Sequence, residues 1–250
     1  MTENQPARLA QMLREARSAV FFGGAGVSTE SGIPDFRSAD GLYNRRYTLP
    51  AETILSHEYF VEETEAFYDF YRDQMLMPGA RPNAAHIALA QWEKEGKLGA
   101  VITQNIDGLH QQAGSRTVWE LHGSVHRNHC MACGKAHGLD AVTESRGVPR
   151  CQCGGIIKPD VVLYGEGLDE IVIQGALDAI AHCDLLIIGG TSLTVYPAAS
   201  YVTLCSGKIV IINKSPTMMD RQADLLITGS IGEAFDAVMK AIEEQASKEP

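Results

Sequence analysis

Short apolar runs alternate with longer amphipathic stretches along most of this 250-residue chain. Glycine or polar residues bound each short run, as is typical of strands buried on both faces, and the longer stretches repeat apolar residues at helical spacing. This pattern predicts strands at residues 19–22, 100–103, 118–121, 185–188, 209–212 and 225–227, and helices at 7–16, 83–95, 170–182, 198–205 and 231–244. We therefore expect an α/β fold in which crossover helices surround a parallel sheet.

Two segments interrupt this alternation. The stretch between the first two strands is too long for one crossover, and its aromatic run at residues 67–71 indicates an inserted helical segment. Residues 122–164 are rich in Cys, His, Gly and Arg but have little apolar periodicity. A segment without its own core needs another source of stability, and a bound metal is the expected one.

Composition narrows the class of protein. With 45% hydrophobic residues the chain is typical of globular proteins, and 21 basic against 31 acidic side chains give a net charge of −10. This charge predicts no direct nucleic-acid binding. The apolar runs are far shorter than the ~20 residues that cross a bilayer, and the first residues lack the features of a secretion signal. We expect a cytoplasmic protein with no membrane partner.

Four of the six cysteines form two close pairs, which predicts one tetrahedral zinc site. The expected ligands are Cys130, Cys133, Cys151 and Cys153. Four thiolates leave no position for an activated water, so this zinc should be structural. Three nearby histidines, His126, His129 and His137, are interpreted as surface residues. The remaining cysteines, Cys183 and Cys205, are interpreted as small buried hydrophobic residues.

The first predicted strand runs into the glycine-rich turn GAG at residues 24–26. Glycines in such a turn let backbone amides approach a phosphate. Thr29 occupies the place of the third glycine of a dinucleotide motif, so an ordinary tight turn is an alternative. In the loop that follows, Arg37 is suited to a phosphate and Phe36 to a planar ring, although a surface turn with an internal Asp–Arg pair would look the same.

Other predicted strands also end in polar residues. Gln104, Asn105 and Asp107 are suited to ribose hydroxyls or a carboxamide, but are also ordinary loop residues. His122 at the next strand end is a candidate general base, with a merely hydrogen-bonded ring as the alternative. Two further strand ends carry small or polar groups, at residues 189–193 and 212–215. Since the ends of parallel strands share one edge, these residues predict a single crevice.

These motifs together resemble the sirtuins, which are NAD-dependent protein lysine deacylases. The matching segments, in family order, are GAGVSTESGIPDFRS, TQNIDGLH, ELHG, the four cysteines, KPDVVLYGE, GTSLTVYPAA and INKSPT. The resemblance implies one catalytic domain over residues 1–250, with a small zinc-ribbon and helical module beside a Rossmann-like sheet. Its expected parts are an NAD-binding core at about 1–35, 82–125 and 165–250, a helical insert at about 36–81 and a zinc module at about 126–160.

The resemblance also assigns residues by motif position. The implied NAD contacts are Gly24, Ala25, Gly26, Thr29, Phe36, Arg37, Gln104, Asn105, Ile106, Asp107, His122, Gly190, Thr191, Ser192, Asn213, Lys214 and Ile231. Within this set, Phe36, Ile106 and Asp107 correspond to the nicotinamide pocket, Asn105 lies next to the reactive ribose, and Ile231 approaches the adenine. A substrate peptide adds as a strand between two segments, which supply Val161, Val162, Tyr164, Gly165, Glu166, Leu193, Thr194, Val195 and Tyr196.

The implied reaction removes acetyl, or another uncharged acyl group, from protein lysines and gives nicotinamide, O-acetyl-ADP-ribose and free lysine. His122 is the implied general base on a ribose hydroxyl, Asn105 and Asp107 are the other catalytic residues, and zinc takes no part in the chemistry. Two alternatives remain: an NAD-dependent mono-ADP-ribosyltransferase, and a non-catalytic NAD-sensing module.

Two positions depart from the pattern of relatives. Tyr164 stands where many of them have phenylalanine. Relatives that prefer acidic acyl groups carry Tyr-x-x-Arg in the helical insert, whereas here Tyr71 stands three residues after Tyr68. Without the arginine, burying a succinyl carboxylate would cost several kcal/mol. We therefore expect acetyl to be preferred over succinyl.

Overall fold

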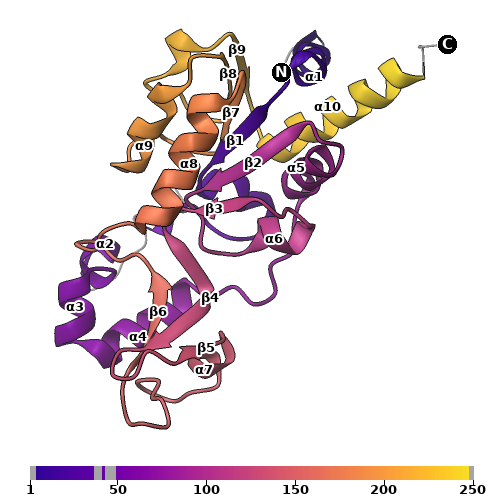
Figure 1. Ribbon diagram of the computed structural model, residues 1–250. Coiled ribbons are helices and arrows are strands. Elements are labelled where there is room, and N and C mark those ends of the chain that lie inside the picture. Colours follow the sequence, from indigo (N-terminus) through magenta and orange to yellow (C-terminus); the bar gives the residue numbers. More distant parts are fainter. Residues whose placement is uncertain (1–3, 37–40, 43–48, 248–250) are drawn as a thin grey trace.

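The computed structural model describes residues 4–36, 41–42 and 49–247. Its larger sheet has six parallel strands in the order β3-β2-β1-β7-β8-β9 (Figure 1). The strands are β1 (Ala19–Gly23), β2 (Leu98–Thr103), β3 (Val118–Glu120), β7 (Leu185–Gly189), β8 (Lys208–Asn213) and β9 (Leu225–Thr228). All six predicted strands are confirmed, and the order reverses between β1 and β7. Such a reversal opens a crevice at the carboxyl ends of the strands.

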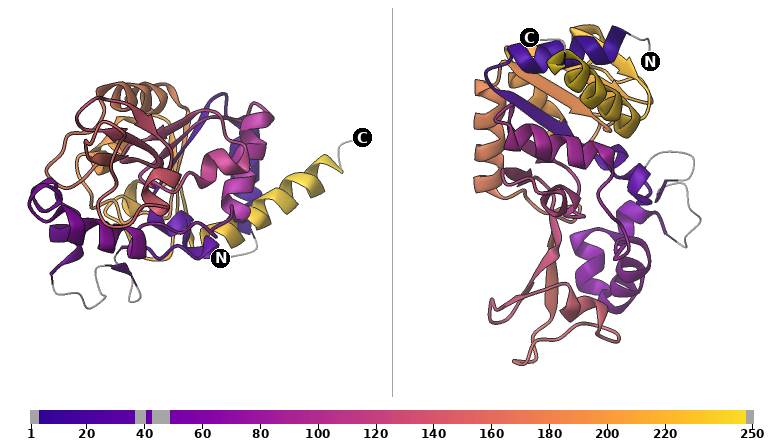
Figure 2. Two further views of the ribbon diagram at one scale, coloured as in Figure 1. Left: turned by 90° about the horizontal axis from the view of Figure 1, so that it is seen from below. Right: turned by 90° about the vertical axis from the view of Figure 1, so that its right-hand side faces the viewer.

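Helices cover both faces of this sheet (Figure 2). One face carries α1 (Asn4–Glu15), α5 (Ala84–Lys94) and α10 (Ile231–Ala246), and the other α8 (Glu170–His182), α9 (Ala198–Tyr201) and the 3-10 helix η4 (Val202–Leu204). The predicted helices are therefore confirmed, the one at 198–205 as an α-helix followed by a 3-10 turn. The apolar stripe of α10 faces the core as expected, because Phe235 and Val238 are fully buried.

Side-chain caps fix where the important helices begin. Asn83 accepts a hydrogen bond from the Ala85 N–H at 2.9 Å, and Asp169 accepts one from the Ile171 N–H at 2.8 Å. Ser230 caps α10. Because each cap satisfies an amide that the helix itself leaves unpaired, these helix starts are rigid points at the edge of the sheet.

A second part of the molecule lies beyond the carboxyl ends of the parallel strands (Figure 2). It contains α2 (Ala51–Ile54), α3 (His57–Glu62), α4 (Thr64–Gln74) and α7 (Asp140–Thr143), and an antiparallel sheet of order β5-β4-β6. The strands of this sheet are β4 (Gly123–Cys130), β5 (Ala136–His137) and β6 (Ile157–Val161). Aromatic side chains of the α3–α4 region pack against Val125, Val161 and Leu163. The helical insert and the small sheet thus share one core.

The small sheet is the main feature that the hydrophobic pattern does not predict. Its longest strand, β4, has an irregular register between Ser124 and Asn128. Within it, the two consecutive residues His126 and Arg127 are both exposed, which breaks the two-residue alternation of a half-buried strand.

Shorter elements complete the description. These are α6 (Leu109–Ala113) and the 3-10 helices η1 (Ala25–Val27), η2 (Thr29–Ser31) and η5 (Asp220–Gln222). No helix in the described part of the chain combines the length and apolar character needed to span a membrane. Cys183 is buried as expected, whereas Cys205 is only half-buried, with its sulfur 3.7 Å from that of Cys183.

Candidate active site

The turn after β1 packs directly against the turn after β7. The backbone N–H of Gly24 donates to Gly189 O at 3.3 Å, and the N–H of Gly26 donates to Gly190 O at 2.8 Å. A Cβ at position 26 would lie 2.8 Å from the Gly190 backbone, and Gly190 itself has a φ of +60°. Only glycines allow this approach. The turn that the sequence singles out therefore lies at the reversal point of the sheet.

His122 lies just after β3, at the same edge. Its Nδ1–H donates to the carbonyl oxygen of Gln104 at 3.0 Å, which leaves Nε2 as the nitrogen with a free lone pair. Burial lowers the pKa of His122 below its ordinary 6.5, and the hydrogen bond to Gln104 opposes the shift in part. The ring is thus neutral near pH 7, as a general base must be.

Ser28 connects the glycine turn to the loop after β2. Its hydroxyl donates to Asp107 Oδ2 at 2.7 Å and accepts from Asn105 Nδ2 at 3.0 Å. The second carboxylate oxygen of Asp107 accepts the Leu109 N–H at 2.9 Å. From α5, His86 Nε2 approaches the same hydroxyl at 3.5 Å. This network fixes the orientation of Asn105 and Asp107, which the sequence predicts to be catalytic residues beside His122.

Thr191 joins the ends of β2, β7 and β8. Gln104 Nε2 donates to Thr191 Oγ1 at 3.1 Å, and Asn213 Nδ2 donates to Thr191 O at 3.0 Å. Ile231, the first residue of α10, lies against Gly189, where a Cβ would come within 2.2 Å of Ile231 Cδ1. Side chains from four elements distant in sequence therefore meet here.

One large cavity of about 1280 Å³ follows this edge and continues between the two parts of the molecule. Its lining includes the following predicted NAD contacts: Gly24, Ala25, Gly26, Thr29, Phe36, Gln104, Asn105, Ile106, Asp107, His122, Gly190, Thr191, Ser192, Asn213, Lys214 and Ile231. The remaining predicted contact, Arg37, lies outside the described residues. Phe36 and Ile106 are partly buried against the core of the helical insert, so the cavity is apolar on that side.

The two segments expected to hold a peptide meet the same cavity with most of their residues. Val161, Val162, Tyr164, Gly165, Glu166, Val195 and Tyr196 contribute to its lining. Leu193 and Thr194 do not. The Leu193 side chain is buried, with 1% exposed, in the core beneath the large sheet, and Thr194 is exposed.

Several residues of the site are not predicted from the sequence. Ser28 and His86 become relevant only through their contacts, because an isolated Ser or His carries no signal of its own. Glu30 is a further case: its carboxylate accepts hydrogen bonds from the Ser230 hydroxyl and from the Gly232 N–H, and so joins the glycine-rich region to the start of α10. In the sequence, Glu30 of the segment GAGVSTESGIPDFRS has no feature that distinguishes it from an ordinary exposed residue.

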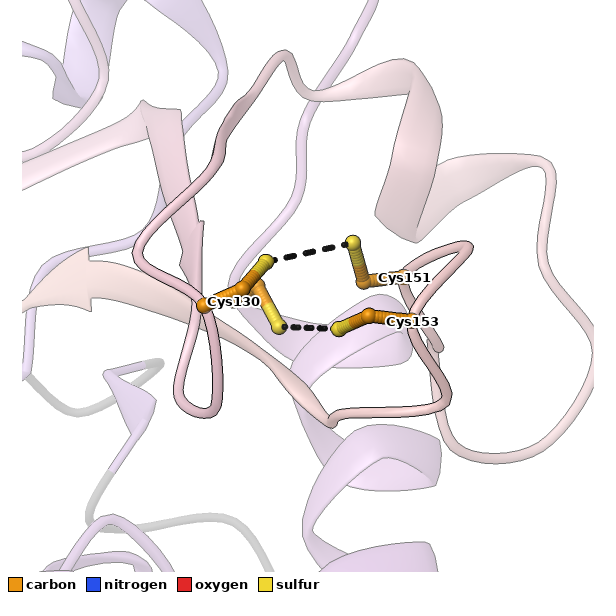
Figure 3. A group of neighbouring side chains, drawn as sticks. Cys130, Cys151 and Cys153 are labelled. Carbon is orange, nitrogen blue, oxygen red and sulfur yellow. Dashed lines mark hydrogen bonds between the residues drawn. The ribbon is translucent and has the colours of Figure 1, made fainter.

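The four predicted zinc ligands converge beside the small sheet, and Figure 3 labels three of them, Cys130, Cys151 and Cys153. All four sulfur atoms lie within 4.8 Å of one another, with Cys130 and Cys153 at 3.4 Å and Cys133 and Cys151 at 3.8 Å. A Zn–S bond of about 2.3 Å gives a tetrahedral S–S edge of about 3.8 Å, so the sulfurs have the right separation. The four-cysteine cluster fits one structural zinc. A Cβ at Gly155 would lie 2.6 Å from Cys130 Sγ, so the loop around the sulfurs is tightly closed.

The three nearby histidines are less free than expected. His126 is exposed, but its Nε2–H donates to the Asp107 carbonyl oxygen at 3.0 Å. His129 lies at the surface with 43% of its side chain exposed, and it contacts the Asp160 carboxylate through Nδ1. His137 is half-buried, and its Nε2 is buried, so the interpretation as a surface residue is inaccurate for His137. No histidine joins the metal-ligand cluster among the described residues.

Comparison with known proteins identifies relatives along nearly the whole chain. Residues 24–197 match the model of the Sir2 family. An NAD-dependent protein deacetylase of Clostridium acetobutylicum is 55% identical over 236 residues, covering 92% of this chain and 96% of the relative. One of Cutibacterium acnes is 55% identical over 238 residues, covering 94% and 98%.

Solved structures agree with this assignment. A Sir2 structure that addresses the mechanism and regulation of Sir2 enzymes has a TM-score of 0.87 and 38% identity to this chain. The match covers 98% of this chain and 100% of that chain. A Sir2–p53 peptide–NAD+ complex has a TM-score of 0.85 and 37% identity, covering 96% and 98%. On the family match and these identities, the chain belongs to the Sir2 family.

Proposed function

We propose that the protein removes acetyl groups from lysine side chains of proteins and uses NAD as the acyl acceptor. The observation that carries the proposal is a neutral imidazole, His122, in the same cavity as the glycine turn. The relatives of this protein are named NAD-dependent protein deacetylases, and one solved relative holds a peptide together with NAD. NAD supplies an electrophilic ribose carbon and the ribose hydroxyl that takes up the acyl group.

The residues of this chain then have separate tasks. Nε2 of His122 accepts the proton of a ribose hydroxyl, while the Gln104 carbonyl keeps the proton on Nδ1 and supports the charged ring. Asp107 and Asn105, fixed by Ser28, bind polar groups near the reacting centre. The glycine turn brings backbone N–H groups to the edge where a diphosphate would lie. Zinc, held by the four cysteines, stabilises the small sheet.

The peptide site rests on backbone geometry. Residues 162–165 are joined to the helical insert on one side, where the Tyr164 N–H donates to Leu55 O at 3.0 Å. Within the described part of the chain, the backbone N–H and C=O of Gly165 make no hydrogen bond. An extended peptide that adds as a strand would pair with such groups. Backbone pairing reads few side chains, which favours a broad range of protein substrates.

Product analysis tests the proposal. The purified protein is incubated with NAD and an acetyl-lysine peptide, with the unacetylated peptide as control, and nicotinamide is measured. We expect nicotinamide release only with the acetylated peptide, together with acetyl-ADP-ribose and free lysine by mass spectrometry. An ADP-ribosylated protein would support the transferase alternative, and NAD binding without turnover would support the sensing module.

A further inference from the structure

The side chain of Glu166 is only 19% exposed, although the residue is among those that line the cavity at the candidate peptide site. One carboxylate oxygen, Oε2, accepts from Lys158 Nζ at 3.1 Å and from the Leu163 N–H at 2.9 Å. The other, Oε1, accepts from Nδ1–H of His57 at 2.8 Å. We call these three side chains, His57, Lys158 and Glu166, the Glu166 network. Oε2 of Glu166 is thus bound by Lys158 and the Leu163 backbone, and Oε1 is bound by His57 of the helical insert.

The Lys158 side chain is only 10% exposed, and its charge is fully satisfied. Its three N–H donors reach Glu166 Oε2, the Pro159 carbonyl at 3.1 Å and the Val161 carbonyl at 3.3 Å. Its Nζ also lies 5.9 Å from the centre of the Phe60 ring on α3. A buried ammonium with every donor used holds its neighbours in one arrangement, because any movement leaves a charge unpaired.

His57 ties this arrangement to the helical insert at two points. Its ring donates to Glu166, and its backbone N–H donates to Tyr164 O at 2.9 Å. The preceding residue, Ser56, caps α3 by accepting from the Tyr59 N–H at 3.1 Å. Both ends of residues 161–166 are therefore bound: one through Lys158 and β6, the other through His57 and α3.

Electrostatics supports the charged form of the carboxylate. Burial by itself raises the pKa of Glu166, but the hydrogen bonds from Leu163 and His57 and the charge of Lys158 outweigh it, and the pKa falls below its ordinary value. Glu166 stays ionised near neutral pH and accepts all three bonds.

We propose that the Glu166 network holds residues 161–166 in the arrangement that accepts a peptide, in which β6 ends at Val161 and a turn follows, closed by the bond from the Glu166 N–H to Leu163 O. His57, Lys158 and Glu166 are then positioning residues for the protein substrate. This inference rests on the proposed function and adds to it. A segment that is already ordered loses less conformational freedom when a peptide binds, so the network favours binding and leaves the chemical step unchanged. Its loss should therefore raise the KM for the peptide with little change in kcat.

His57 gives the sharpest test because its side chain is 50% exposed and can be changed without opening the core. His57→Leu removes the donor, whereas His57→Asn keeps an N–H two bonds from Cβ, the same position as Nδ1. Glu58→Gln, an exposed neighbour on α3, is the matched control. Glu166→Gln removes the charge and keeps the volume.

Kinetics are measured with an acetyl-lysine peptide at saturating NAD, together with calorimetric binding of the peptide in the presence of ADP-ribose. Peptide KM and Kd should rise about tenfold in His57→Leu and Glu166→Gln, with kcat within about threefold. His57→Asn and Glu58→Gln should remain within about twofold of the wild type. Zinc content, and the affinity for ADP-ribose without peptide, should not change in any variant.

Unchanged peptide affinity in His57→Leu would overturn the inference, and so would a fall in kcat at constant KM, or an equal defect in His57→Asn. If the wild-type protein binds the peptide but does not turn it over, the proposed function fails while the calorimetric comparison still decides the role of the network. A wild-type protein that does not bind the peptide rules out both.

Discussion

At the scale of single residues, one hydrogen bond decides which nitrogen of His122 is available. A backbone carbonyl can only accept, so the contact with Gln104 places the proton on Nδ1 and leaves the lone pair on Nε2. Burial keeps the ring neutral, and the same carbonyl supports the positive ring that forms when a proton is taken up. Position and protonation state together distinguish this histidine from a merely structural one.

Replacing His122 tests its role directly. His122→Ala removes the only proposed proton acceptor, so deacetylation should fall by at least about a hundredfold, while NAD, held by groups on several strand ends, still binds. Peptide deacetylation assays and calorimetry with NAD check the two statements. His182→Ala, which changes an exposed histidine on α8, is the control and should be fully active. Turnover near the wild-type level in His122→Ala would contradict the assignment.

The pH dependence of the wild-type enzyme gives an independent check. A general base must be neutral, so activity falls as pH drops through its pKa. Because burial lowers the pKa of His122, the acid limb of kcat/KM should have its midpoint below the ordinary value of 6.5. Rates measured across this range, with protein shown to be folded at each pH, locate the limb. A midpoint above 6.5 would argue against a buried, neutral base.

At the scale of elements, the zinc site depends on close packing of the loop around Gly155. Cys130 ends β4 and Cys153 lies in the turn before β6, and their sulfurs meet beside Gly155, where a Cβ would lie 2.6 Å from Cys130 Sγ and 2.7 Å from Ala132 Cβ. A methyl group there must displace a metal ligand. The fold of this module and its metal are therefore coupled.

Substitutions in the module should show this coupling. Cys130→Ala and Cys151→Ala should lose zinc and become sensitive to proteolysis between residues 126 and 160, and Gly155→Ala should bind zinc at least about tenfold more weakly. Zinc content after dialysis and competition with a chelator measure both effects. Cys183→Ala and Gly79→Ala, which lie outside the cluster and in open space respectively, are the controls. Full zinc content in Cys130→Ala would refute the site.

Two residues of the helical insert bear on the expected preference for acetyl over succinyl. Tyr71 is fully buried among aromatic rings, and Arg72 donates to Val142 O at 3.0 Å and to Ser145 Oγ at 2.8 Å. Neither side chain lines the cavity. The arginine that follows the Tyr-x-x-Tyr pattern is thus used to join α4 to α7 and the loop after it.

A series of acylated peptides tests this arrangement. A succinyl carboxylate would enter the apolar side of the cavity without the partner that Tyr-x-x-Arg relatives supply, so kcat/KM for succinyl-lysine should be at least about tenfold lower than for acetyl-lysine. Kinetics on matched acetyl-, propionyl- and succinyl-peptides give the ratio. Higher efficiency with the succinyl peptide would show that another cation, such as Arg81 at the cavity wall, reaches the carboxylate.

The elements differ in how far the sequence predicts them. The strands of the parallel sheet are apolar on both faces and bounded by turns, so their hydrophobic runs are unmistakable. β4 carries a bulge and β5 is only two residues long, so neither produces a period. The cysteines carry a strong spacing signal, and the glycine turn carries a partial one, because Thr29 stands in the place of the third glycine. Ser28, Glu30, His86 and the Glu166 network have roles that arise only from contacts between distant segments, which no local pattern records.

At the scale of the whole molecule, the large sheet and the smaller part meet along the cavity. The polar strand ends line one wall, and the core of the helical insert with residues 161–166 forms another. The glycine turn is hydrogen-bonded to the end of β7, and Glu30 just after it is hydrogen-bonded to the start of α10. Residues 161–166 are held to α3 by the Glu166 network. The proposed cofactor site therefore lies mainly at the large sheet, and the proposed peptide site lies between residues 161–166 and residues 195–196, with His122 in the wall of the same cavity.

Two buried histidines link the stability of the whole molecule to pH. His86 and His110 are fully buried, with ring centres 4.7 Å apart. Burial lowers the pKa of His86 to about 4, with partial opposition from Asp107, and burial together with the neighbouring His86 lowers the pKa of His110 to about 3. In the unfolded chain both should titrate near 6.5. Between these values the unfolded state binds more protons than the folded state.

The free energy of unfolding should therefore be fully retained above pH 6.5 and fall as the pH drops below it. Each histidine contributes a loss of about 2 kcal/mol by about pH 5, before ordinary carboxylates titrate. Denaturant unfolding at pH 7 and pH 5, in the zinc-loaded protein, measures the difference. His110→Leu removes one of these groups and should reduce the loss by about 2 kcal/mol, while His182→Ala, which changes an exposed histidine, should leave it unchanged. The same loss in His110→Leu as in the wild type would show that the acid sensitivity comes from other groups.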